Sequence, residues 1–380
     1  YVDGRFGSFS TNRLDKKELE TLITNGIEST RYLAVDESRM LADPARYYKG
    51  GKPDLQLFDK KLYEVNPDDK VAIARAAAEE VLGKDERIIS VDSSYSDGEG
   101  SSYRLISNGF EGESKSTWFS VSASVSIKGE GEARPQDYWY DSALFYDKLT
   151  KTGIGAKALE RVLRKLGQKK AKSGKYTMVV DPMNVGNLLS PMLSALYGSA
   201  LQQKNSFLMD KLDTKVASDL FTLRDEPHAI GANGSRYFDN EGVATEPRTV
   251  FDKGVLKTYF IDTYNGKKMD IAPTISAPSR LILTLGDKDL NGLVADIKQG
   301  ILVTGFNGGN SNSSTGDFSY GIEGFLIEDG KLTQPVNEMN VTGNMVTLWN
   351  SLVAVGNDPQ PNRSWQIPSL VFEGVDFSGL

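Results

Sequence analysis

The chain has 380 residues, a net charge of −7, one histidine and no cysteine. The absence of cysteine excludes disulfide bonds and thiol nucleophiles and fits a reducing cytoplasm. The excess of acidic residues argues against binding to a nucleic-acid backbone, which needs clustered basic side chains. No apolar run reaches the roughly 20 residues of a membrane-spanning helix. The length predicts two or three domains, and the opening Y-V-D-G-R-F-G-S reads as folded chain, not as a signal peptide.

Two helices are predicted near the amino end. Asp15 followed by Glu18 is a capping-box arrangement. Apolar residues then follow at helical spacing, namely Leu19, Leu22, Ile23, Ile27 and Leu33. The second helix begins with Asn66 as its N-cap and Pro67 as its first residue, and it closes at Gly83. We expect both helices to act as scaffold.

A half-buried antiparallel strand is predicted from Phe119 to Ile127, where apolar residues alternate with serines. Its serine face reads as a wetted sheet surface, with ligand binding as the alternative. The aromatic residues Tyr138, Trp139 and Tyr140 read first as core or inter-domain packing and second as an interaction surface.

An amphipathic helix is predicted from about Gly155 to Leu166. Its apolar stripe consists of Leu159, Val162, Leu163 and Leu166, and the basic residues Arg161, Arg164 and Lys165 lie opposite. The polar segment G-Q-K-K-A-K-S-G-K follows and marks the strongest domain boundary.

The predicted fold class is α+β. Residues 1–172 form an N-terminal α/β region with amphipathic helices, open to division into two subdomains, and residues 173–380 form a strand-rich, mainly antiparallel domain. Turns are predicted at 252–254 and 329–330, beside apolar runs such as V-L-K-T-Y-F-I. Short helices are expected at about 290–299 and 344–354.

The segment from Asp181 to Leu208 reads D-P-M-N-V-G-N-L-L-S-P-M-L-S-A-L-Y-G-S-A-L-Q-Q-K-N-S-F-L. It resembles the active-site segment of the TldD/TldE (PmbA) metallopeptidase family. Further blocks stand in family order along essentially the whole chain, among them N-S-F-L-M-D-K-L, Y-F-D-N-E-G-V-A-T, S-T-G-D-F-S-Y-G-I-E-G-F-L-I-E-D-G-K and V-G-N-D. In the catalytic TldD branch this helix carries H-E-x-x-x-H, and the alignment puts Ser190, Pro191 and Ala195 at its His, Glu and His.

These three positions therefore lack a zinc ligand, whereas catalytic zinc usually takes three protein ligands. We expect Ser190 to be a helix N-cap and Pro191 the first helical residue. The alternative is that Ser190 is a catalytic nucleophile, but no His or Lys lies nearby in the sequence to activate it. We assign no catalytic, cofactor-binding or metal-ligating residue to this chain.

Two other segments are candidate metal-binding or ligand-binding sites. His228 follows Asp225 and Glu226 in a turn-rich loop; such a set could hold a metal, but a lone loop histidine is more often solvated or hydrogen-bonded. Residues 308–317 are rich in glycine and serine but lack the G-K-[ST] ending of a phosphate loop. They read as a hairpin loop, or as a place where an extended peptide can approach the backbone.

The resemblance implies a zinc-less, non-catalytic subunit of a cytoplasmic TldD/TldE-type complex that degrades or processes unfolded peptides. Zinc is then expected in a TldD-like partner that forms a heterodimer with this chain, and the isolated chain can form a homodimer. We expect no nucleic acid and no membrane as partners. Two alternatives remain: a regulatory or binding protein acting on DNA gyrase or another partner, and an independent hydrolase that uses carboxylates and another metal.

Overall fold

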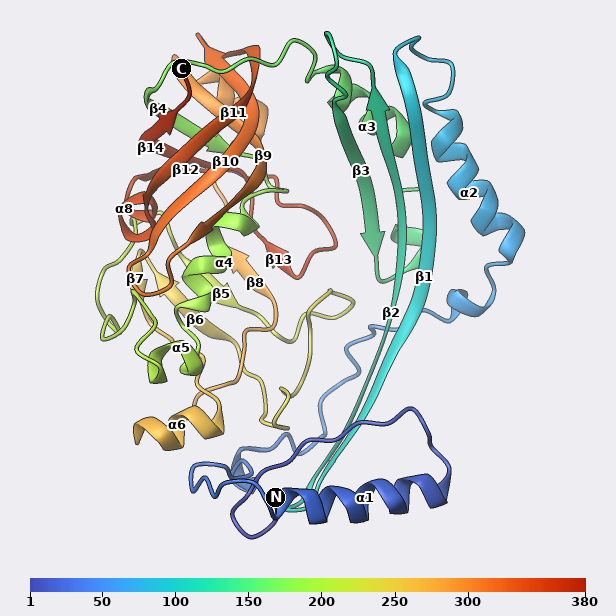
Figure 1. The fold of residues 1–380 in the computed structure, drawn as a ribbon, viewed down its shortest axis with the longest axis vertical. Helices are drawn as coiled ribbons and strands as arrows, with labels where there is room; N and C mark the ends of the chain where they lie inside the picture. Colours follow the sequence, from blue (N-terminus) through green and yellow to red (C-terminus); the bar gives the residue numbers. More distant parts are fainter.

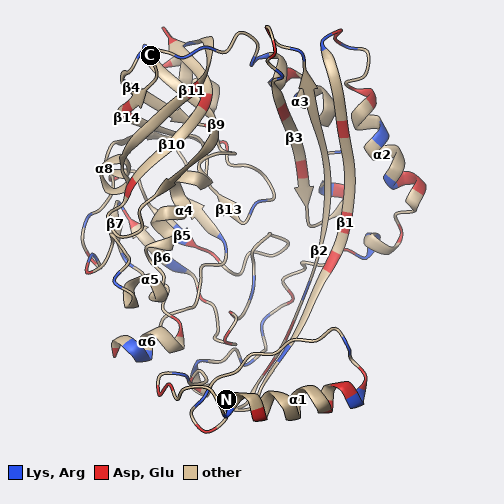
Figure 2. Cartoon of the chain, in the orientation of Figure 1, with Lys and Arg blue, Asp and Glu red and all other residues tan.

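The computed structural model describes residues 1–380 as an N-terminal segment, a central layer and a larger C-terminal lobe (Figure 1). The fold is α+β with mainly antiparallel sheets, as predicted. Acidic and basic residues are interspersed along the surface helices α1 and α2 (Figure 2). No helix has both the length and the apolar character that crossing a membrane would require.

The N-terminal segment contains α1 (Lys16–Thr30). Its cap is the predicted one, because the Asp15 carboxylate accepts the Glu18 N–H at 3.0 Å. The predicted apolar stripe, however, is not packed: the exposed fractions of Ile23 and Ile27 are 59% and 40%. The helix instead packs against the preceding segment at Gly26. An added Cβ there would lie 3.0 Å from the Phe9 ring.

The central layer is the antiparallel sheet β1-β2-β3, with α2 and α3 packed on it (Figure 1). The bounds are β1 Ile88–Ile106, β2 Phe110–Ile127, β3 Gln136–Ala143, α2 Pro67–Glu79 and α3 Ile154–Leu163. Short 3-10 helices lie at Pro44–Arg46, Lys60–Tyr63 and Tyr146–Lys148. The predicted alternation is confirmed, since Phe119, Val121, Ala123, Val125 and Ile127 are all buried in the central core. Asn66 caps α2 as predicted, but the helix ends at Glu79, before Gly83.

The helices α2 and α3 meet backbone to backbone. An added Cβ on Gly155 would lie 1.9 Å from the Ala77 carbonyl oxygen, so only glycine permits this approach. The Glu80 carboxylate at the end of α2 accepts the N–H groups of Gly153, Gly155 and Ala156 at 2.6, 2.8 and 3.2 Å. These contacts satisfy the first free N–H groups of α3 and hold it against the end of α2.

The C-terminal lobe contains a sheet in the order β11-β10-β9-β4-β14-β12. The bounds are β4 Gly174–Val180, β9 Gln299–Ser311, β10 Asp317–Glu328, β11 Lys331–Asn344, β12 Leu352–Val355 and β14 Leu370–Ser378. Residues 340–342 of β11 also pair with residues 376–378 of β14, so five of these strands close on themselves. Within this sheet only β4 and β9 pair in parallel.

A second sheet in this lobe has the order β13-β8-β5-β6-β7. The bounds are β5 Leu223–Asp225, β6 Arg248–Asp252, β7 Val255–Leu256, β8 Leu281–Leu283 and β13 Trp365–Gln366. The helices are α4 Gly186–Ser194, α5 Gly198–Gln202, α6 Thr263–Met269, α7 Leu290–Ala295 and α8 Met345–Asn350. The apolar run V-L-K-T-Y-F-I is a strand only at its start, in β7, and the predicted helix over 290–299 ends at Ala295 because β9 begins at Gln299.

Each of the two large parts has its own apolar core. A cluster of 43 buried residues fills the C-terminal lobe, reaching Phe110 and two residues of segment 42–47, and a cluster of 13 lies between the central sheet and its helices. Between these cores Lys165 of the central layer forms an ion pair with Glu323 of the lobe. That junction positions the candidate site.

Candidate functional site

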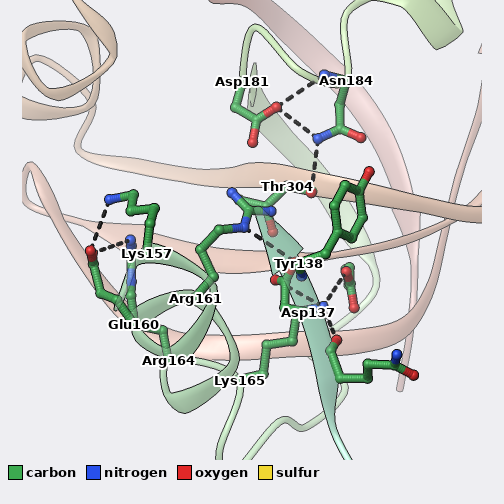
Figure 3. Close-up of polar contacts among 12 residues, drawn as sticks. Asp137, Tyr138, Lys157, Glu160, Arg161, Arg164, Lys165, Asp181, Asn184 and Thr304 are labelled. Carbon is green, nitrogen blue, oxygen red and sulfur yellow. Dashed lines mark hydrogen bonds and ion pairs between the residues drawn. The ribbon is translucent and has the colours of Figure 1, made fainter. Parts of the chain in front are cut away.

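The segment that resembles the family's active-site helix begins at the end of β4. The buried Asp181 carboxylate turns the chain there, because its Oδ1 accepts the Asn184 N–H at 3.0 Å and the Asn184 side-chain amide at 2.7 Å. The same amide donates to the Thr304 carbonyl oxygen on β9 at 2.8 Å (Figure 3). The turn fixes the start of α4 relative to the closed sheet.

The predicted start of this helix is wrong. The helix α4 starts at Gly186, so Ser190 is not an N-cap and Pro191 is not the first helical residue; Pro191 lies inside the helix. The physical reason is that the Asp181–Asn184 contacts begin the helix five residues earlier than the Ser-Pro pair suggests. Pro191 has no N–H, so the Asn187 carbonyl lacks its usual helical donor.

The side chains at the three motif positions do not fit a zinc site. Ser190 is exposed and offers one hydroxyl, Pro191 offers no donor atom, and Ala195 is only 1% exposed within the large apolar core. Nowhere in residues 1–380 do three or more His, Asp or Glu side chains converge in a way that could hold a metal ion. We derive no chemical step through a metal in this chain.

His228 lies elsewhere, on the loop after β5. Its Nε2 is 3.0 Å from the Thr245 hydroxyl, and its ring packs on Tyr237. Burial, followed by the positive charge of Lys52, lowers the pKa of His228. The neighbouring Asp225 carboxylate accepts the N–H groups of Ser279 and Arg280 instead of facing the imidazole. The structure therefore does not bring the acidic residues and His228 together.

The glycine-rich segment 308–317 forms the end of β9 and the turn into β10. Gly309 has φ +102°, and an added Cβ there would lie 2.1 Å from the Ser319 carbonyl oxygen. The close backbone approach that glycine allows is thus made by the chain's own β10. A role in binding an extended peptide stays a prediction.

A cavity of about 580 Å³ lies where the central layer meets the C-terminal lobe. The central layer contributes Trp139 from β3, Lys157 and Arg161 from α3, and Arg164 just beyond it. The lobe contributes Asp181 and residues near α7, β9 and β11. The cavity therefore opens beside the turn that leads into α4.

Charged side chains hold this junction together. The Lys165 ammonium donates to Glu323 Oε1 at 2.7 Å and to the Gln136 carbonyl oxygen at 3.0 Å, and it lies 3.1 Å from Asp137 Oδ2. Arg161 pairs with Asp137 at 3.2 Å (Figure 3). Arg164 lies over the Phe325 ring at 4.7 Å. Glu323 and Phe325 belong to β10, so the contact of Lys165 with Glu323 and that of Arg164 with Phe325 cross between the two parts, whereas those with Gln136 and Asp137 lie within the central layer.

Arg161 and Lys165, on the helix face opposite the apolar stripe, are therefore largely buried. Their side chains are 15% and 9% exposed. Helical periodicity identifies the face toward the sheet, but the opposite face of α3 is covered by the C-terminal lobe, and only tertiary packing reveals that. Trp139 takes the predicted inter-domain role, since it lines the cavity and lies under the Arg161 guanidinium at 5.5 Å.

The Asp181 carboxyl group in the cavity wall has a raised pKa. Burial raises the pKa of Asp181 to about 6, against the opposing effects of the Asn184 side chain and the Arg161 charge. Desolvation wins because the carboxylate lies almost wholly out of water while its nearest donors are neutral amides. Perturbed carboxyl groups of this kind cluster at functional sites, although structural networks produce them too.

Comparison with known proteins identifies the family to which the chain belongs. Residues 173–379 match the model described as the PmbA/TldA metallopeptidase C-terminal domain, and residues 60–166 match the PmbA/TldA metallopeptidase central domain. The chain belongs to the PmbA/TldD metallopeptidase family. This membership confirms the resemblance seen in the sequence.

Curated family members share the whole length of the chain. It is 28% identical to the metalloprotease PmbA homolog of Haemophilus influenzae over 100% of this chain and 84% of that protein. It is 27% identical to the metalloprotease PmbA of Escherichia coli O157:H7, with the same coverage.

Solved family structures share the fold. A Bacteroides thetaiotaomicron protein whose name refers to modulation of DNA gyrase is 74% identical, with a TM-score of 0.99 over 100% of this chain and 87% of that chain. TldE from Thermococcus kodakarensis has a TM-score of 0.82 at 21% identity, over 97% of this chain and 86% of that chain. The latter likeness establishes the fold alone.

Proposed function

We propose that this chain is a zinc-less, non-catalytic subunit of a TldD/TldE-type metallopeptidase complex that degrades or processes unfolded peptides. The observation that carries the proposal is the donor set at α4, where Ser190, Pro191 and Ala195 offer one exposed hydroxyl and no imidazole or carboxylate. A zinc ion with three protein ligands and an open position cannot be built from these groups. The metal and the bond-breaking groups then belong to a TldD-like partner.

Within this proposal the chain contributes shape, substrate access and a partner surface. A heterodimer with the partner is the working form, and a homodimer is the default when the partner is missing. We propose that the complex works in the cytoplasm. Because α4 carries no acid, base or metal ligand at the motif positions, the isolated chain is expected to leave peptides uncut.

Metal analysis of the purified chain tests the proposal most simply. The chain and a TldD-like protein from the same genome are purified separately under identical conditions, and zinc per polypeptide is measured by mass spectrometry. We expect about one zinc per TldD-like chain and far less than one per chain of the present protein. Stoichiometric zinc or another metal in the present chain would favour the independent hydrolase instead.

A second candidate function is regulation of DNA gyrase without proteolysis. It is favoured by the name of the structure from B. thetaiotaomicron, which is 74% identical to this chain. Its test is a gyrase supercoiling assay with the purified chain. A change in supercoiling that persists with zinc chelated and no TldD-like protein present would support this candidate over the subunit role.

A further inference from the structure

The cavity at the junction is lined by more basic than acidic side chains. Four basic side chains line it: Lys157, Arg161, Arg164 and Lys331. Figure 3 shows Arg161 extending toward Thr304 and the Asp181 turn, with Lys157 beside it on α3. The first three come from one end of the central layer, and Lys331 comes from the start of β11. Cations from both parts of the molecule thus converge on one space.

The carboxylates that pair with these cations lie behind them, outside the cavity lining. Asp137 pairs with Arg161, and Glu160 is shared by Lys157 at 2.9 Å and Arg164 at 3.9 Å. Lys331 makes no ion pair. Lys157 and Arg164 therefore share the Glu160 carboxylate, and Lys331 has no carboxylate partner.

The two carboxylates that do line the cavity have other partners. Asp358 accepts the N–H groups of Ser369 and Leu290 at 2.9 Å and the Ser369 hydroxyl at 2.8 Å. Asp181 accepts both donors of Asn184. Both carboxylates are thus hydrogen-bonded by neutral donors, and neither forms an ion pair with a basic side chain of the lining. The basic side chains can therefore bind an external anion.

The lining also contains apolar side chains, beside the polar residues Asn291, Thr304 and Gln360. Leu290, Val294, Leu302 and Leu332 form one side, with Trp139 and Met183 nearby. Small-molecule sites typically combine such an apolar wall with a few placed polar groups and often lie between domains. The ligand that fits has an anionic end and an apolar side chain. A dianion such as phosphate is disfavoured, because Asp181 and Asp358 lie in the same wall.

We propose that this cavity binds the C-terminal residue of a peptide, with its α-carboxylate among Lys157, Arg164 and Lys331 and its apolar side chain against the leucine-lined wall. The inference rests on the proposed function, since it assumes that the chain handles peptides. It assigns to this subunit the capture of one substrate end, away from the bond that the partner cuts. Because the lining comes from both parts of the molecule, the bound residue also bridges the junction.

The test uses the isolated full chain and isothermal titration calorimetry with N-acetyl-Ala-Ala-Leu carrying either a free carboxylate or a C-terminal amide. We expect the acid to bind at least about tenfold more tightly than the amide, as a charge-assisted contact predicts. Equal affinity of the two peptides, or no heat from either, would overturn the proposal. N-acetyl-leucine distinguishes the source of the carboxylate: binding as tight as the tripeptide acid would overturn the assignment to a peptide.

A matched pair of variants locates the site. Lys331→Met removes the unpaired cation of the cavity, and Lys17→Met makes the same change on the exposed surface of α1. Lys331→Met should weaken binding of the acid about tenfold and leave amide binding unchanged, while Lys17→Met should change neither. Equal effects of the two substitutions would contradict the location. No partner protein is used, so failure here leaves the subunit proposal standing.

Discussion

Replacing Asp181 by asparagine should stabilise the protein at neutral and alkaline pH. The pKa of this carboxyl rises from 3.8 to about 6 on folding because the group is buried. The folded state therefore binds more protons than the unfolded state between these two values, so stability falls as pH rises through this window. The penalty is absent below pH 3.8 and complete above about pH 6.

The size of this penalty follows from the shift. A pKa difference of about 2 corresponds to about 3 kcal/mol of unfolding free energy. Asp181→Asn has nearly the same shape, carries no charge and keeps an oxygen that can accept the Asn184 N–H. Its new amide donors need a partner, which offsets part of the gain. We expect the variant to be more stable by about 1–3 kcal/mol at pH 8 and about equal to the parent near pH 4.

The assay is urea unfolding of parent and variant between pH 4 and pH 8, followed by tryptophan fluorescence. Asp329→Asn, in the exposed turn between β10 and β11, is the matched control and should show no pH-dependent gain. The reasoning is refuted if the stability difference between Asp181→Asn and the parent is the same at every pH. It is also refuted if the variant is less stable at pH 8.

Three further predictions concern the packing that forms the junction. Glu80→Ala leaves three N–H groups at the start of α3 without an acceptor, and a lower urea midpoint equivalent to about 1–2 kcal/mol is expected; an unchanged midpoint would contradict this capping role. Lys165→Met leaves the half-buried Glu323 without its cation and should cost about 2 kcal/mol in thermal or urea unfolding; adding Glu323→Gln should recover part of the loss, and no recovery would argue against the pairing. Gly155→Ala should destabilise by more than about 2 kcal/mol because of the Ala77 carbonyl, whereas Gly186→Ala, with open space around it, should be neutral or stabilising by up to about 1 kcal/mol; similar midpoints for the two variants would contradict the close approach.

Local signals in the sequence predicted local structure well. The caps of α1 and α2 were predictable because Asp15 and Asn66 accept hydrogen bonds from backbone N–H groups three residues away. The strand from Phe119 to Ile127 was predictable because its two faces differ in polarity. The family was recognisable because its blocks stand in order along the chain.

Features that depend on distant contacts were not predictable. Nothing in the spacing of Arg161 and Lys165 indicates that a second lobe covers their face of α3. The start of α4 depends on a side-chain contact between Asp181 and Asn184, which outweighs the Ser-Pro signal at position 190. The cavity was missed because Lys331 joins the α3 cations only through packing.

The central claim is that this chain needs a zinc-bearing partner to act on peptides. The most direct measurement is cleavage of an unstructured peptide by the chain, by a TldD-like protein from the same genome, and by their mixture, each with and without a zinc chelator. The account predicts cleavage that requires both proteins and stops with the chelator. Cleavage by this chain alone, or a mixture no more active than the TldD-like protein by itself, would contradict it.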